Sequence, residues 1–291
     1  MSRLLILLVA HLLALSTAHS APMRIATFEV DATPPLGSPL AYDPMTGRDV
    51  PLSCKGIIIQ GDSKPIVLCA VDWIGIGSTG QTEFKEALAK AAGTIPERVA
   101  VHTLHQHDAP RCNFAADALL KPHGLSGSAF NVEHARRVIK DAASAVTKAE
   151  FKSVTHVGHG EAAVREVASN RRILGDDGKV RTMRWTACRD PKLRALPVGT
   201  IDPMLKTVSF WLKDECLAVL SYYACHPQSY YRTGAPSPDF PGLARNARQK
   251  DSGIPHIHFT GAGGNVGAGK YNDGSKGNRQ VLADKMSTAM K

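Results

Sequence analysis

The sequence predicts an α/β protein in which mixed or stacked β-sheets are flanked by helices. Three observations carry this prediction. Short apolar runs of strand length alternate with amphipathic segments of helix length. The order strand, helix, strand, helix over residues 65–147 indicates a βαβ unit with a parallel pair of strands. The second half of the chain is richer in strand signals, so we expect either two sheets or one mixed sheet.

The first strand and helix of the expected βαβ unit lie between residues 65 and 93. Pro65–Val71 is a continuous apolar run, which predicts a strand buried on both faces. Ser78 and Gln81 form a capping pair that opens a helix over about 83–92, and Gly93 ends this helix.

The second strand and helix complete the unit. Val99–Thr103 alternates apolar and polar residues in the manner of a strand. Asn131 is a helix cap, and we expect a long amphipathic helix from there to about Thr147. The apolar face of this helix contains Val132, Ala135, Val138, Ile139, Ala142 and Val146.

The second half is expected to contain a hairpin, a buried strand and a final helix. Residues 206–213 and 215–224 are apolar runs separated by Asp214, which predicts two antiparallel strands with a tight connection. The run 256–259 predicts another buried strand, and 279–290 has helical spacing of its apolar residues.

The composition is that of an ordinary globular protein. The chain has 291 residues, of which 43% are hydrophobic and 21% are charged. The formal net charge is +9, but the basic residues are scattered and form no long run. We therefore predict no nucleic-acid partner, and attraction to acidic substrates or anionic surfaces is another use of this charge. The six cysteines show no Cys-x-x-Cys spacing, which argues against a cysteine zinc knuckle.

The first residues have the pattern of a secretory signal peptide. A short charged start precedes the apolar run 4–15, and small residues follow it, so cleavage is expected near Ala18 or Ser20. The apolar run is too short for a comfortable membrane span. We expect a signal peptide over residues 1–20, a mature domain over 21–291, and a secreted or periplasmic location.

Polar residues follow the ends of several predicted strands. Asp72 follows the first strand, His105 and His107 follow the second, and His226 ends another apolar run. In open α/β sheets, ligands gather outside the carboxyl ends of strands. Residues two apart in an extended segment share a face, so His105 and His107 point the same way and can serve one metal ion with His226. The alternative is that these are ordinary loop histidines.

The motifs around these histidines resemble those of a known family. Residues 104–110, Leu-His-Gln-His-Asp-Ala-Pro, are similar to the Thr-His-Thr-His-Ser-Gly-Pro motif of the neutral/alkaline non-lysosomal ceramidases. Residues 223–227 resemble the second histidine motif of that family, and 239–242 resemble its Asp-Tyr-Pro-Gly. Further parallels, in the same order along the chain, are residues 33–37, Asp72 and the pair Asn170-Arg171.

The resemblance implies a ceramidase N-terminal-domain-like fold and a role for each matching residue. His105 and His226 would be zinc ligands, and Zn²⁺ would be the cofactor. His107 would lie beside the metal-bound water and pass a proton to the leaving amine. Arg171 would bind the substrate carbonyl oxygen or the negative charge that develops on it. Zinc lowers the pKa of bound water toward about 7.

The activity implied by the resemblance is zinc-dependent hydrolysis of a linear amide bond, with a metal-bound water as the nucleophile rather than an acyl-enzyme. The implied substrate is a small-molecule or lipid amide, such as a ceramide-like N-acyl lipid. That substrate would place the protein in sphingolipid metabolism and in peripheral contact with membrane lipid.

The chain departs from the family pattern in two places. The family has a glycine-rich hexapeptide, Gly-Asp-Val-Ser-Pro-Asn, where this chain has residues 264–269, so Gly267 replaces the serine and Asn265 the aspartate. The family also completes its metal shell with a glutamate and a tyrosine further along, in a region beyond residue 291. The residues left open as a third ligand are Asp239, Asp72, Asp108 and His107, with Asp239 better suited to orienting a ligand.

Two other functions fit the same residues. The first is a noncatalytic or degenerate relative that binds a ligand or has a structural role. The second is a different metal-dependent hydrolase, such as an esterase. The departures from the family pattern fit a fragment of a longer protein, a minimal relative, or a relative that has lost activity.

Overall fold

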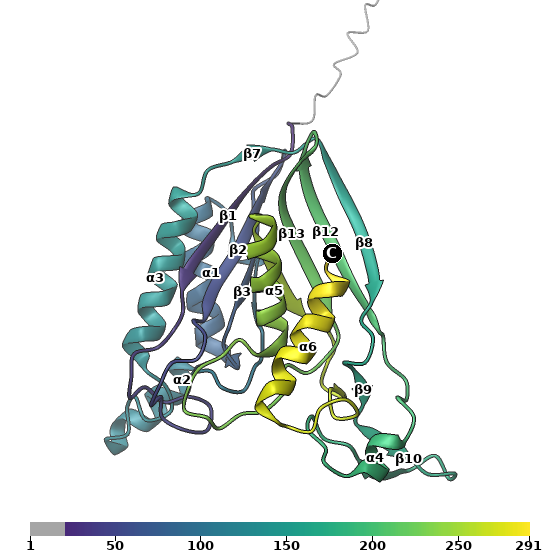
Figure 1. Ribbon diagram of the computed structural model, residues 1–291. Coiled ribbons are helices and arrows are strands. Elements are labelled where there is room, and N and C mark those ends of the chain that lie inside the picture. The colour runs from purple at the N-terminus through teal and green to yellow at the C-terminus, as the bar shows by residue number, and fades with distance from the viewer. Residues whose placement is uncertain (1–20) are drawn as a thin grey trace, which may run out of the picture.

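The computed structural model describes residues 21–291. The predicted signal peptide lies outside the described residues. No described helix is both long enough and apolar enough to cross a membrane. The fold contains two main sheets, each covered on one side by helices, and the predicted α/β class is confirmed (Figure 1).

The first sheet has the strand order β5-β3-β2-β1-β7. Its strands are β1 (Arg24–Asp31), β2 (Ser53–Gln60), β3 (Ile66–Val71), β5 (Val99–Thr103) and β7 (Lys152–Ser153). Strands β3 and β5 are parallel, and the other neighbours are antiparallel. The crossover from β3 to β5 passes through helix α1 (Ser78–Ala92), so the predicted βαβ unit is confirmed.

The second sheet has the strand order β14-β13-β12-β8. Its strands are β8 (His156–Ala163), β12 (Met204–Leu212), β13 (Glu215–Tyr223) and β14 (His256–Thr260). Strands β12 and β13 form the predicted antiparallel hairpin, and their connection is a two-residue turn in which Lys213 has a φ of 54°. Strand β14 lies parallel to β13, so the carboxyl ends of these two strands are at the same edge.

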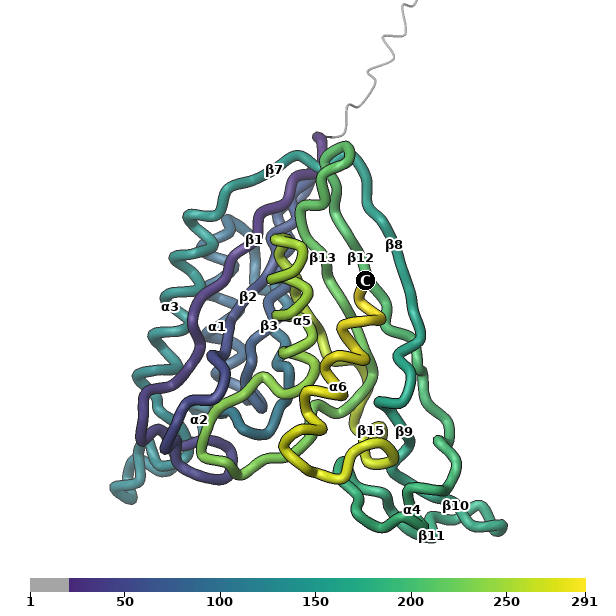
Figure 2. The backbone as a smooth tube through the Cα atoms, in the orientation of Figure 1, coloured from purple at the N-terminus to yellow at the C-terminus, as the bar shows by residue number. Residues whose placement is uncertain are grey.

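Four longer helices cover the sheets (Figures 1 and 2). Helices α1 and α3 (Val132–Lys148) pack beside the first sheet. Helices α5 (Asp239–Ser252) and α6 (Lys276–Ala289) pack on each other and against the second sheet. In Figure 1, α5 and α6 lie at the front of the molecule, and α1 and α3 lie on the left.

Short elements connect these layers. The helical ones are α2 (Phe114–Leu120), α4 (Pro191–Ala195) and two 3₁₀ turns, Pro96–Arg98 and Lys121–His123. The short strands form three ladders of two strands each. They are β4 (Gly75–Ile76) with β6 (Arg111–Cys112), β10 (Arg172–Leu174) with β11 (Val180–Met183), and β9 (Ser169–Asn170) with β15 (Val266–Gly267).

Three clusters of buried apolar side chains fill the space between the layers. Neighbouring residues of a strand point to opposite faces, so Ile58 packs toward Phe84 of α1 while Ile57 packs toward the second sheet. Ile257 of β14 belongs to the same cluster between the sheets. Phe240 of α5 belongs to the cluster under α5 and α6. The two sheets are therefore stacked, with helices on the outside of the pair.

The start of α1 differs from the prediction. The helix begins at Ser78 instead of 83, and its cap residue is Gly77, which makes no side-chain cap hydrogen bond. The expected capping pair of Ser78 and Gln81 is therefore wrong. The side chain of Gln81 donates instead to the carbonyl of Val101 in β5 over 3.1 Å. The predicted end is confirmed, because Gly93 adopts a left-handed φ of 66° there.

The other predicted elements are close to those observed. Asn131 accepts a hydrogen bond from the backbone N–H of His134 and caps α3, as expected. Helix α6 begins three residues earlier than the predicted 279–290. The sequence did not predict β1, β2 or β8. Strand β8 is mostly exposed and contains two glycines, so it has little apolar pattern to identify it.

A buried ion pair joins the end of β3 to helix α5. Arg245 donates to both carboxylate oxygens of Asp72, over 2.7 and 2.9 Å, and both side chains are fully buried. The hydroxyl and backbone N–H of Ser53 also donate to Asp72 Oδ2, each over 2.8 Å. Burial raises the pKa of Asp72, but Arg245 and these hydrogen bonds outweigh it and lower the pKa below its usual value.

We predict that buried His258 makes the fold sensitive to acid. Burial, followed by the charge of Arg245, lowers the pKa of His258 to about 3. The unfolded chain, with a histidine pKa of about 6.5, binds more protons than the native state below that pH. The contribution of His258 to the free energy of unfolding is therefore fully present above about pH 6.5. It falls on acidification by up to about 1.4 kcal/mol per pH unit.

The variant His258→Gln is expected to reduce this loss between pH 7 and pH 5, measured as the free energy of unfolding in urea. The control His159→Gln, at an exposed position of β8, should keep the wild-type slope. An unchanged slope in His258→Gln would contradict the prediction, whatever the absolute stability of the variant.

Candidate metal centre

Three histidines come together where the two sheets end. His105, His107 and His226 each offer a ring nitrogen, and these atoms lie within 4.8 Å of one another. The Nε2 atoms of His107 and His226 are 2.9 Å apart. No other group of three or more His, Cys, Asp or Glu side chains within residues 21–291 is arranged to hold a metal ion. The two histidine segments singled out in the sequence therefore meet in space.

The sheet topology explains this meeting. His105 follows β5, and its backbone N–H donates to the carbonyl of Trp73, which follows the neighbouring parallel strand β3. His226 follows β13, and its backbone N–H donates to the carbonyl of Val266 over 2.8 Å. His105 has a φ of 70°, a left-handed conformation that is uncommon for a residue with a side chain. Backbone strain of this kind is often concentrated at functional sites.

Hydrogen bonds to the Nδ1 atoms orient the imidazoles of His105 and His107. His105 Nδ1 lies 2.6 Å from the backbone carbonyl of Ile74, so that nitrogen carries the proton and Nε2 is left to accept a metal. His107 Nδ1 bonds to the hydroxyl of Tyr42 over 2.9 Å. Histidines that bind metals in proteins are usually held in this way through their second nitrogen.

The electrostatic environment keeps the imidazoles of His107 and His226 neutral. Burial, with smaller contributions from His107, His105 and Arg171, lowers the pKa of His226 to about 3. Burial, followed by the charges of His105 and Arg171, lowers the pKa of His107 to about 4. Neutral imidazole is the form that binds a metal. At neutral pH these rings therefore need no deprotonation before they can act as ligands.

The donor set fits zinc. Zinc–nitrogen bonds of 2.0–2.1 Å in a tetrahedral site place neighbouring donors roughly 3.3 Å apart. The observed nitrogen positions, within 4.8 Å of one another and 2.9 Å apart in one pair, are close to that spacing. Three protein ligands and one open position are the usual composition of a catalytic zinc site.

The aspartates considered as a third ligand are engaged elsewhere. Asp72 pairs with Arg245, as described above. Asp108 and Asp239 are buried and face the guanidinium of Arg279 at 3.7 and 3.6 Å. Of the residues left open by the sequence, His107 is the one that the structure groups with His105 and His226.

Arg171 lies next to the histidine cluster. Its backbone N–H donates to the carbonyl of Asn265 and its Nη1 to that of Gly264, and its guanidinium stacks on the exposed ring of Trp185 at 4.9 Å. Its Nε is buried without a hydrogen-bond partner among the described residues. The contribution of Arg171 to the lowered pKa of His226 is consistent with this proximity.

The glycine-rich segment 261–269, which we call the glycine run, packs closely against the site. A Cβ atom on Gly263 would lie 2.9 Å from backbone atoms of Cys225 and His226, so only glycine fits there without a shift. A Cβ atom on Gly267 would lie 2.9 Å from Thr186. The side chain of Asn265 donates to Asn170 over 2.8 Å. The run therefore packs against the histidine loop and Arg171 instead of forming a free turn.

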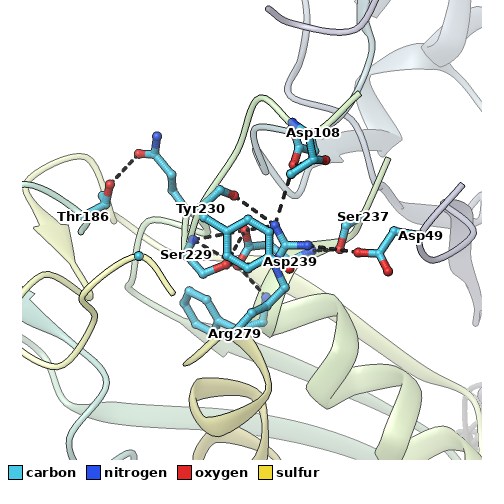
Figure 3. A network of polar contacts seen from close by, with 12 residues as sticks. Asp49, Asp108, Thr186, Ser229, Tyr230, Ser237, Asp239 and Arg279 are labelled. Carbon is cyan, nitrogen blue, oxygen red and sulfur yellow. Dashed lines mark hydrogen bonds and ion pairs between the residues drawn. The ribbon is translucent and has the colours of Figure 1, made fainter. Parts of the chain in front are cut away.

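Arg279 of α6 is the centre of a polar network that includes residues of the loops after His107 and His226 (Figure 3). It is almost completely buried. Its Nε donates to Ser229 Oγ over 2.8 Å, Nη1 to Asp49 over 3.1 Å and Nη2 to the carbonyl of Tyr230 over 2.9 Å. The guanidinium also stacks on the Tyr230 ring at 3.6 Å. One side chain thus contacts two segments of the chain that are far apart in sequence, at Asp49 and at residues 229–230.

The two carboxylates facing Arg279 connect this network to the histidine loops. Asp108 directly follows His107 in the sequence. Asp239 accepts a hydrogen bond from the backbone N–H of Ser229, three residues after His226, over 3.1 Å (Figure 3). The guanidinium therefore holds the loop after β5 against the loop after β13, and it fixes the relative position of the histidines.

Sequence reasoning missed several of these residues. Tyr42 lies in an irregular segment with no periodic pattern, and Arg279 is one of 35 basic residues, so neither had a signal of its own. Four tyrosines flank His226 in the sequence, Tyr222, Tyr223, Tyr230 and Tyr231, and such residues can line a pocket or pack in the core. Tyr231 lies beside His107, with ring centroids 5.4 Å apart. Tyr223 is part of the core.

Comparison with known proteins agrees with the fold. No family model and no curated protein matches the sequence. The solved structure of neutral ceramidase from Pseudomonas aeruginosa is similar, with a TM-score of 0.65 and 17% identity over 92% of this chain and 44% of that one. A structure described as ceramidase complexed with C2 is similar at a TM-score of 0.64, with 17% identity over 92% of this chain and 43% of that one. The chain therefore has a ceramidase-like fold and spans less than half the length of these proteins.

We predict that Arg279 positions the metal ligands. In Arg279→Gln, the buried carboxylates of Asp108 and Asp239 lose their counter-charge, so the two histidine loops shift. The Kd for zinc, measured by competition with a chromophoric chelator, should rise about tenfold or more, as for other residues that orient metal-binding histidines.

The matched control is Lys285→Gln in the same helix, where an exposed ion pair with Glu166 is removed. It should leave the zinc affinity unchanged. Arg279→Gln also lowers stability, so affinities are compared at a temperature at which circular dichroism shows both variants folded. Equal affinities of the two variants would refute a positioning role for Arg279.

Proposed function

We propose that this chain is a zinc-dependent hydrolase that cleaves a linear N-acyl amide bond. The observation that carries the proposal is the cluster of three imidazole donors within 4.8 Å of one another. The ceramidase-like fold supports it, because the structural neighbours are described as ceramidases. We also propose that the protein is exported, on the pattern of its first 20 residues.

His105, His107 and His226 would hold the ion. Bound zinc would supply a Lewis acid for the carbonyl group and an activated water at neutral pH. Low pKa values keep His107 and His226 available as neutral donors. The backbone carbonyl of Ile74 fixes the tautomer of His105, and the Tyr42 hydroxyl orients His107.

Arg171 would stabilise negative charge on the carbonyl oxygen. Its guanidinium is held on the ring of Trp185, and its Nη1 on the carbonyl of Gly264. A donor fixed in this way needs little reorganisation when charge develops, which is the basis of electrostatic stabilisation in acyl transfer.

His107 has two candidate roles, and they differ in what its removal does. As a third ligand, its loss removes the metal. As the proton shuttle implied by the family resemblance, its loss leaves the metal in place and reduces turnover. We propose the ligand role, since the Nε2 atoms of His107 and His226 face each other at 2.9 Å.

We predict one zinc ion per chain in the purified protein. His105→Ala, His107→Ala and His226→Ala should each lose it, because each removes one of three donors. Metal content is measured by atomic emission after dialysis, and circular dichroism checks the fold. The control His123→Ala, at an exposed position away from the cluster, should keep its zinc.

Retention of stoichiometric zinc by both His105→Ala and His226→Ala would eliminate the proposed site. Retention by His107→Ala alone would assign that residue to the proton-transfer role. Activity is measured on a panel of N-acyl amides with matched esters. Turnover of the esters alone would make the protein an esterase, and zinc binding without turnover of either would make it a noncatalytic relative.

For Arg171→Ala we predict a normal zinc content and a decrease in kcat of roughly 10²–10³-fold, as for other donors that stabilise an oxyanion. The neighbouring Arg172 has an exposed side chain, so Arg172→Ala is the matched control and should have wild-type kcat. Equal kcat values for the two variants would remove the proposed role of Arg171.

A further inference from the structure

Arg232 is held in place beside the histidine cluster. Its backbone N–H donates to Asp108, the residue after His107, over 2.8 Å. Its φ of 66° is a left-handed conformation, which is uncommon for a residue with a side chain. The guanidinium lies 5.3 Å from the ring centroid of Tyr42 and 6.0 Å from that of Tyr231. Arg232 is exposed, yet stacking on two rings limits its motion.

These two tyrosines connect Arg232 to the cluster. The ring of Tyr42 stacks on His107 at 5.6 Å, and its hydroxyl bonds to the same imidazole. The ring of Tyr231 lies 5.4 Å from His107 and 4.9 Å from Tyr42. Both tyrosines are about two-fifths exposed, with relative accessibilities of 42% and 39%. They form an open aromatic surface next to the proposed metal site.

A second arginine approaches the same surface. Arg111 donates to the carbonyl of Ala41 over 2.6 Å, which places its guanidinium next to Tyr42. Burial raises the pKa of Tyr42, while the charges of Arg111 and Arg232 both lower it, which is consistent with the proximity of both arginines. We call Arg111 and Arg232 the arginine rim.

The nearby carboxylates do not neutralise the arginine rim. Among residues 21–291, no carboxylate lies within 4.0 Å of the guanidinium of Arg111 or Arg232. Asp108 and Asp239 are buried and face Arg279. The acidic groups of these loops therefore point into the protein, and fixed cationic groups point outward beside the cluster.

We propose that the arginine rim binds a carboxylate of the substrate, so that the preferred substrate is an N-acyl amino acid instead of an uncharged N-acyl lipid. This inference rests on the proposed amide hydrolase function and specifies its substrate class. Arginine is suited to the task because its planar guanidinium matches the geometry of a carboxylate. The exposed rings of Tyr42 and Tyr231 provide apolar contact for the rest of the molecule. The net charge of +9 would also steer an anionic substrate toward the protein.

The test compares two substrates with the same acyl chain, an N-acylglycine and the corresponding N-acylethanolamine, which differ mainly in a carboxylate against a hydroxyl. For the zinc-loaded wild-type protein, we expect kcat/KM for the acid to exceed that for the alcohol by about tenfold, the size of one charge-assisted contact. The preference should decrease between 0.05 and 0.5 M NaCl, because salt screens exposed charges.

The variants Arg232→Gln and Arg111→Gln should each reduce this preference, mainly through a higher KM for the acid. The control is Arg181→Gln, an exposed arginine of β11, which should keep the wild-type preference. An equal or greater kcat/KM for the N-acylethanolamine would overturn the inference and leave the hydrolase function intact. A preference for the acid that survives in both variants would overturn the role of the rim.

A binding experiment separates failure of the inference from failure of the proposed function. In the matched ketones, a CH₂ group replaces the amide NH, so neither compound can be hydrolysed. Calorimetry should show a Kd for the ketone acid about tenfold lower than for the ketone alcohol, and Arg232→Gln should remove the difference. If the protein hydrolyses no amide, the hydrolase proposal fails, and this pair still decides whether the rim selects a carboxylate.

Discussion

The buried ion pair between Asp72 and Arg245 is the constraint on which the site depends. Asp72 directly follows β3, beside the strand that leads to His105, and Arg245 belongs to the helix that follows the His226 loop. Removing one partner of a buried pair leaves an uncompensated charge, which typically costs about 3–5 kcal/mol. The pair therefore fixes α5 against the end of the first sheet. Because the two histidine segments belong to different sheets, this attachment determines whether they meet.

Helix α5 extends this constraint to the other side of the site. Its first residue, Asp239, holds the loop after His226 through Ser229, and Arg245 lies further along the same helix. Arg279 of α6 then joins Asp239 to Asp108. The two helices thus connect both histidine loops through buried charges, with an apolar cluster beneath them. Such an arrangement fits the need of a metal site for ligands held by rigid elements.

Much of this arrangement was predictable from local patterns, and the rest was not. The βαβ unit and the hairpin β12-β13 have continuous apolar runs that predict their strands. Because ligands bind outside the carboxyl ends of strands, the positions of His105 and His226 after two strands predicted that they share a site. Strand β2 was missed because its buried positions include Lys55, whose charge is paired with Glu29 at 3.0 Å. Long-range polar contacts have no sequence signature of their own. Arg279 and its partner Asp49 are 230 residues apart, and only the folded chain brings them together.

Three neutral imidazole donors would leave the proposed metal site strongly positive, and this charge bears on which substrates it would bind. A divalent cation held by three neutral imidazoles would keep its full formal charge, whereas each carboxylate ligand would remove one unit. Here the carboxylates of Asp108 and Asp239 are turned toward Arg279, and Arg171 adds positive charge beside the cluster. If the proposed function holds, a neutral lipid would gain little from this field, while an anionic group next to the amide bond would gain from both the cation and the arginine rim. The fold is similar to that of ceramidases, but under our proposal substrate choice would depend on side chains such as Arg111 and Arg232 that the fold does not specify.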